Sequence, residues 1–100
     1  MKPITFHPRA EAEYLAAIDY YEGERQGLGL EFQAEVEQAV AAIRRDPQRY
    51  PVYEEEDVRQ YIVRRFPYSI VYGDLEDRIW IAAVAHHSRR PGYWASRRPD

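Results

Sequence analysis

The feature that most constrains the fold is a stripe of apolar residues at helical spacing, which follows "GLGL" at residues 27–30 and ends before Asp46-Pro47. The stripe consists of Phe32, Val36, Ala39, Val40 and Ile43. Intervals of three and four residues place such side chains on one side of an α-helix. Asp46-Pro47 ends the pattern, because proline cannot continue a helix. The sequence therefore predicts an amphipathic helix here.

A second helix is predicted just before it, over residues 9–25. Pro8 suits the first helical position, where the backbone N–H has no partner in any case. Its expected apolar face consists of Ala12, Leu15 and Ile18, with Tyr14 and Tyr21 beside it. Only a few glycine-rich residues join the two helices, so we expect them to lie antiparallel. Each presents one apolar stripe to a shared surface, and that surface has to be a sheet.

Four runs rich in β-branched and aromatic residues supply the strands of this sheet. They are "PITFH" at residues 3–7, "VRQYIVRRF" at 58–66, "YSIVYGD" at 68–74 and "RIWIAAVAHH" at 78–87. Short turns separate the last three runs, which predicts an antiparallel meander. The segment "QRYPVYEEED" before them is predicted to be a loop with a solvated acidic run at 54–57.

The last run is apolar on both of its alternating faces, which is typical of a central strand. Its two expected faces are Ile79, Ile81, Ala83 and Ala85 on one side, and Trp80, Ala82, Val84 and His86 on the other. The predicted architecture is a single α+β domain over residues 1–100, in the order β-α-α-β-β-β. An antiparallel helix hairpin packs on one face of a mostly antiparallel sheet, and the other face is expected to be partly open.

Composition excludes several classes of protein. The chain has no cysteine and only 3 histidines without zinc-ligand spacing, so neither a metal nor another cofactor is expected. The longest apolar run, Ile79 to Ala85, is far too short to cross a membrane, and we expect a cytoplasmic protein. A net charge of -3 argues against nucleic-acid binding as the main activity.

Charge is divided unevenly along the chain. Residues 1–56 carry 6 basic and 12 acidic side chains, whereas residues 57–100 carry 8 basic and 5 acidic ones. All the bases of the second part are arginines, which can pair with a carboxylate or a phosphate through two hydrogen bonds. This imbalance predicts one positive surface that faces an anionic partner.

The stretch "AHHSRRPGYW" at residues 85–94 gathers the side chains best suited to a functional site. His86 or Tyr93 could transfer a proton, and an arginine such as Arg65 could stabilise negative charge, as in RNA cleavage without a metal. The same stretch could instead dock a protein. The candidate binding residues are then Arg64, Arg65, Arg89, Arg90, Tyr93 and Trp94, with Tyr93 and Trp94 expected to be exposed.

Four segments in order, "GLGLEF", "DPQRYP", "RRFPYSIVY" and "VAHHSRRPGYW", resemble the ParE/RelE superfamily of bacterial type II toxins over nearly the whole chain. The resemblance implies a small cytoplasmic toxin that a partner antitoxin wraps and silences. RelE-like members cut messenger RNA on the ribosome without a metal. ParE-like members inhibit DNA gyrase and have no known need for nuclease chemistry.

Two departures from the RelE-like pattern favour the ParE-like branch. Tyr93 matches the catalytic tail tyrosine of the RelE-like nucleases. However, Ser69 and His87 stand where those nucleases carry arginines, and neither replaces a guanidinium over a phosphorane. The favoured interpretation is a gyrase inhibitor that acts by binding and not as an enzyme. The alternatives are a metal-independent endoribonuclease of the ribosome-dependent kind and an inactive toxin-like protein that only binds antitoxin.

Overall fold

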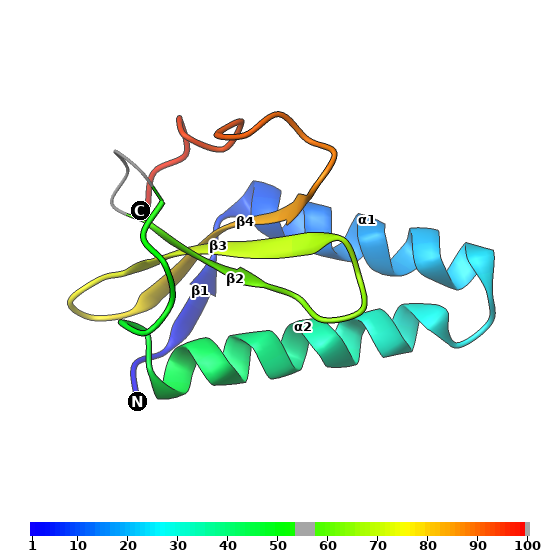
Figure 1. Ribbon diagram of the computed structural model, residues 1–100, viewed down its shortest axis with the longest axis horizontal. Coiled ribbons are helices and arrows are strands. Elements are labelled where there is room, and N and C mark those ends of the chain that lie inside the picture. Colours follow the sequence, from blue (N-terminus) through cyan, green and yellow to red (C-terminus); the bar gives the residue numbers. More distant parts are fainter. Residues whose placement is uncertain (54–57, 100) are drawn as a thin grey trace.

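The computed structural model describes residues 1–53 and 58–99, and it confirms the predicted order of elements. The elements are β1 (Ile4–Phe6), α1 (Pro8–Glu24), α2 (Leu28–Arg45), β2 (Arg59–Ile62), β3 (Tyr68–Asp74) and β4 (Ile79–His86). The four strands form one sheet in the order β1-β4-β3-β2. β1 runs parallel to β4 and the other neighbours are antiparallel, so β4 is a central strand (Figure 1). The expected acidic loop at 54–57 lies outside the described residues.

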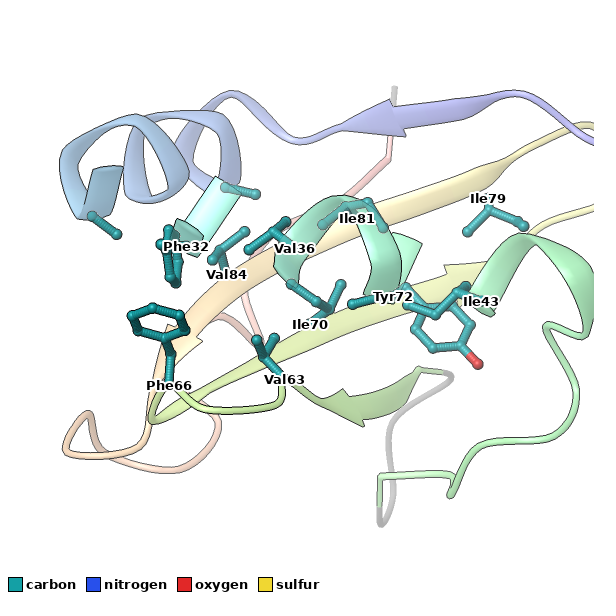
Figure 2. Close-up of a cluster of buried hydrophobic side chains, with 13 residues drawn as sticks. Phe32, Val36, Ile43, Val63, Phe66, Ile70, Tyr72, Ile79, Ile81 and Val84 are labelled. Atoms are coloured by element: carbon teal, nitrogen blue, oxygen red, sulfur yellow. The ribbon is translucent and has the colours of Figure 1, made fainter. Parts of the chain in front are cut away.

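The main core lies between the helix hairpin and one face of the sheet, and α2 contributes to it as predicted. Phe32, Val36 and Ile43 are each at most 1% exposed. They pack with residues of β3 and β4 that point to the same side, as Figure 2 shows for Ile70, Tyr72, Ile79, Ile81 and Val84. The apolar residues that recur at the 3.6-residue period of α2 are therefore the ones that the helix buries against the sheet.

The predicted buried face of α1 is confirmed for Ile18, Tyr14 and Tyr21, which pack against the core, but it was wrong for Ala12 and Leu15. Ala12 is exposed and the Leu15 side chain is 54% exposed, whereas Ala10 and Ala17 are buried. Tyr14 and Tyr21 pack against the core beside these two alanines. The small alanines let α1 approach its neighbours closely, and the two tyrosine rings supply the apolar surface that the sequence analysis had attributed to Leu15.

The start of α2 comes unusually close to α1 at Gly29. A Cβ atom added there would lie 2.7 Å from the backbone oxygen of Ile18 and 3.0 Å from the Cβ of Glu22. The backbone N–H of Gly29 also donates to the Glu22 carboxylate at 3.0 Å. The absence of a side chain at this position is therefore required for the packing of the hairpin.

Gly29→Ala should consequently lower the free energy of unfolding by ~1–3 kcal/mol, the usual effect of overpacking, when measured by urea denaturation. Gly23→Ala is the matched control, because nothing lies within 4 Å of its added Cβ and α1 continues through it. That control should be stabilised by ~0.5–1 kcal/mol through helix propensity. Equal stabilities for the two variants would contradict the close approach.

The two faces of β4 do not alternate strictly, which corrects a second expectation. Val71 of β3 is opposite Ala83 and Tyr72 is opposite Ile81, so one additional β4 residue forms a β-bulge at this point. Ile79, Ile81 and Val84 join the helix-side core, whereas Trp80, Ala82 and Ala83 pack on the opposite side. Val84 therefore points away from Trp80, contrary to the predicted alternation.

The strand predicted over residues 58–66 is also shorter than expected. β2 ends at Ile62, and Arg64 and Arg65 lie in the turn that leads to β3. Arg65 has a left-handed backbone with φ of 70°, which is incompatible with a continued strand. Arg64 and Arg65, which the predicted run placed inside the strand, therefore lie beyond its end.

Candidate functional site

The second face of the sheet is covered by residues 88–99, and it is not open as expected. This segment runs back along the sheet from the end of β4, and it is drawn in orange and red in Figure 1. Trp94 is only 4% exposed and packs in a second core with Val71, Trp80 and Ala83. The ring of Tyr53 meets the Trp94 ring edge to face at 4.9 Å. The expectation that Trp94 is exposed was wrong, because its indole closes this core.

Arg97 anchors the same segment to α1 through a largely buried ion pair. Its guanidinium lies 2.8 Å from the Glu13 carboxylate, and the two side chains are 7% and 16% exposed. Arg97 also donates to the backbone oxygen of Ala82 at 2.8 Å, and Glu13 accepts from the backbone N–H of Val84 at 3.0 Å. The pair thus satisfies polar backbone groups of β4 beyond the end of the short strand β1. No local pattern in the sequence indicated this pair.

Tyr93 is fixed by the same network. Its hydroxyl donates to the Glu13 carboxylate at 2.7 Å. Burial raises the pKa of Tyr93 above its ordinary value, and the hydrogen bond to Glu13 raises it further. The phenol therefore stays protonated and is a poor general base. The guanidinium of Arg89 lies over the Tyr93 ring, 3.9 Å from its centroid.

Ser69 and His87, the two positions that depart from the nuclease pattern, meet in the structure. The Ser69 Oγ lies 2.9 Å from the His87 Nε2, and Ser69 is only 5% exposed. His86 accepts a hydrogen bond at Nδ1 from the backbone N–H of Ser88, and its ring lies edge-on to Tyr68 at 5.0 Å. Within the described part of the chain, neither histidine forms an ion pair with a carboxylate.

These side chains surround a pocket of about 290 Å³ between the ends of β3 and β4 and the segment that follows β4. We call it the tail pocket, and its polar lining comprises Tyr53, Gln60, Ser69, His86, His87, Arg89, Arg90 and Tyr93. The structure thus brings together the candidates His86, Arg89, Arg90 and Tyr93. Trp94 forms part of the pocket wall. Their roles remain predictions.

Arg64 and Arg65 do not line this pocket. Arg65 pairs with Glu31 at 2.7 Å and with Glu35 at 3.5 Å, so it holds the β2–β3 turn against α2. Hydrogen bonds from Arg65 and Arg25 lower the pKa of Glu31, which keeps the carboxylate charged. The arginines that were predicted to form one positive surface therefore lie in two places, with Arg89 and Arg90 at the tail pocket and Arg65 at the β2–β3 turn. Arg65 already pairs with carboxylates of the chain itself.

In the ranges 1–53 and 58–99, no three histidine, aspartate or glutamate side chains gather closely enough to hold a metal ion. None of the helices in these ranges is long and apolar enough to cross a membrane.

Comparison with known proteins assigns this fold and this chain to a class. A solved structure titled "Chromosomal ParDE TA system from P. aeruginosa" has a similar fold, with a TM-score of 0.76 and 18% sequence identity. The match covers 86% of this chain and 96% of that one. The family model described as "ParE toxin of type II toxin-antitoxin system, parDE" matches residues 4–91. The chain therefore belongs to the ParE toxin family. No curated protein matches it.

Proposed function

We propose that the chain is a toxin that inhibits DNA gyrase by binding to it, acts in the cytoplasm, and is neutralised by a cognate antitoxin. Membership of the ParE toxin family supports the toxin and the antitoxin partner. The observation that carries the choice of mechanism is the hydrogen bond between Ser69 and His87. These positions correspond to arginines in RelE-like nucleases, and a serine-histidine pair does not supply the positive charge that RNA cleavage needs.

The state of Tyr93 supports the same choice. A nuclease that uses a tail tyrosine must exchange a proton with the RNA, which is easiest when the pKa lies near the working pH. The pKa of Tyr93 is instead raised, and its hydroxyl is bound to Glu13. Tyr93 is therefore better suited to holding the Arg89 guanidinium in place over its ring than to transferring a proton.

The second candidate, a metal-independent endoribonuclease, is favoured by one observation. His86, Tyr93, Arg89 and Arg90 line one pocket, which is the set of side chains that such chemistry would use.

Expression of the chain alone in bacteria, from a tightly repressed promoter, should remove negative supercoiling from plasmid DNA while messenger RNA stays intact. Both are measured in the same cells, by gels that resolve topoisomers and by mapping of transcript ends. The cognate antitoxin, expressed together with the toxin, should restore supercoiling. Replacing both Arg89 and Arg90 by alanine should weaken the effect, whereas Arg45→Ala, at the end of α2 and away from the tail pocket, should leave it unchanged.

Tyr93→Phe separates the two candidates further. The substitution keeps the ring beneath Arg89 and removes only the hydroxyl, so a binding inhibitor should stay toxic. A nuclease that depends on the phenol should lose ~100-fold or more in cleavage rate. Cleaved messages with intact supercoiling would refute gyrase inhibition. A folded, soluble chain without any growth defect would indicate an inactive relative.

A further inference from the structure

The lining of the tail pocket has an unusual charge for this protein. The chain carries 17 acidic side chains and a net charge of -3, yet no described residue of the pocket lining is a carboxylate. The lining instead includes two arginines, Arg89 and Arg90, and two histidines, His86 and His87. The two arginines concentrate positive charge here, and their hydrogen-bond donors are complementary to an anion.

The two arginines keep their hydrogen-bonding capacity for a ligand. Neither Arg89 nor Arg90 forms an ion pair with a carboxylate anywhere in the described ranges, in contrast to Arg65 and Arg97. Arg89 is nevertheless held in place, because its guanidinium lies over the Tyr93 ring. Tyr93 is itself fixed by its hydrogen bond to Glu13. A positioned guanidinium loses less conformational entropy when it binds an anion.

The rest of the pocket indicates which anion it accepts. Its walls include the apolar side chains of Val71, Ala85 and Pro91, and its volume of about 290 Å³ is small. A charged group that is attached to an apolar neighbour fits this mixture better than the repeated phosphates of a nucleic acid. The helices add to this preference, because α1 and α2 carry 8 acidic and 3 basic side chains and repel a polyanion.

We propose that the tail pocket binds a glutamate or aspartate side chain from a partner protein. The carboxylate pairs with Arg89 and Arg90, and an adjacent apolar side chain of the partner lies against Val71, Ala85 and Pro91. This inference rests on the proposed function only in that the partner is a protein. It adds the chemistry by which that partner is recognised.

The test is a titration of the isotopically labelled full chain, followed by two-dimensional amide NMR. The probes are three: a blocked leucine-glutamate-leucine peptide, the same peptide with glutamine at its centre, and inorganic phosphate. We expect the glutamate peptide to shift the amide signals of residues 87–90, 92 and 93 in a saturable way, and the glutamine peptide to leave them unchanged. Arg89→Ala and Arg90→Ala should each weaken binding roughly tenfold or more, as expected for loss of a charged hydrogen bond.

Arg45→Ala is the control, since this exposed arginine lies outside the pocket and should bind the peptide as the parent does. Unchanged amide signals remote from residues 87–93 report that each variant is folded. Saturable binding of phosphate without binding of the glutamate peptide would overturn the proposal, and so would no saturable shift with any probe. Equal binding by the two arginine variants and the parent would also overturn it.

This experiment is independent of the proposed function, because it needs neither gyrase nor antitoxin. If the peptide fails to bind while plasmid supercoiling is still lost in cells, only the carboxylate pocket is wrong. If the peptide binds while messages are cleaved, only gyrase inhibition is wrong.

Discussion

Trp94→Ala is expected to lower the free energy of unfolding by ~3–5 kcal/mol, the range typical of removing a buried aromatic side chain. The indole is 4% exposed and packs on Val71, Trp80 and Ala83, so its removal opens a cavity over the second face of the sheet. Urea denaturation followed by circular dichroism measures the change. Leu15→Ala is the matched control, because the sequence pattern predicted Leu15 to be buried and it is 54% exposed.

The control should change stability by no more than ~0.5 kcal/mol, as is usual for surface positions. If Trp94→Ala proved as harmless as Leu15→Ala, the second core would be refuted. The result also affects how toxicity data are interpreted. Loss of toxicity in Trp94→Ala would report a damaged fold and not a lost contact with the target, so this variant cannot be compared directly with Tyr93→Phe.

Arg97→Ala is expected to cost ~3 kcal/mol or more of stability, because it leaves the largely buried Glu13 carboxylate without its cation. The backbone oxygen of Ala82 loses a donor at the same time. Urea denaturation measures the stability, and hydrogen exchange at the Val84 amide reports on β4 directly, since that N–H donates to Glu13.

Arg65→Ala is the control for this second prediction. Arg65 also pairs with carboxylates, but its side chain is 54% exposed, and exposed ion pairs contribute only ~0–1 kcal/mol. A loss of stability in Arg97→Ala that is no larger than the loss in Arg65→Ala would contradict the structural role assigned to the pair of Glu13 and Arg97.

The sequence predicted the elements that depend on local periodicity, and the structure confirms them. The stripe of α2 and the turn between the last two strands are patterns over a few neighbouring residues, so they can be recognised without knowledge of distant contacts. Part of the buried face of α1 was missed, because hydrophobicity alone ranks Leu15 above Ala10 and Ala17. Close packing selects the small side chains here.

The bulge in β4 had no signal in the sequence. Ala82, Ala83 and Val84 are all apolar, so a shift of one residue leaves no polar side chain on the wrong face to reveal it. The β2–β3 turn was misplaced for a similar reason. The run "VRQYIVRRF" retains strand-like composition up to Phe66, although the strand ends at Ile62.

The candidate site was only partly predictable. Neighbours in the sequence, such as His86, Arg89, Arg90 and Tyr93, line the same pocket because one turn of the chain carries them. Arg97 was overlooked because serine, arginine and proline are typical of a solvated tail. Its partner Glu13 is 84 positions away in the sequence. Contacts of that separation cannot be recognised from composition or from periodicity.

The pairing of β1 with β4, together with the bond between Glu13 and Arg97, links the first strand and first helix to parts of the chain that the ribosome makes much later. During synthesis, β1 emerges first and has no strand to pair with until residues 79–81 follow it. The second core cannot close until Trp94 has been made, and the backbone oxygen of Ala82 in β4 has no donor from Arg97 until that residue follows. Non-local contacts of this kind slow folding, because a long loop must close before they form. A nascent chain that is stopped before residue 94 therefore lacks the indole that packs over Val71, Trp80 and Ala83, and it leaves this apolar part of the sheet without that cover.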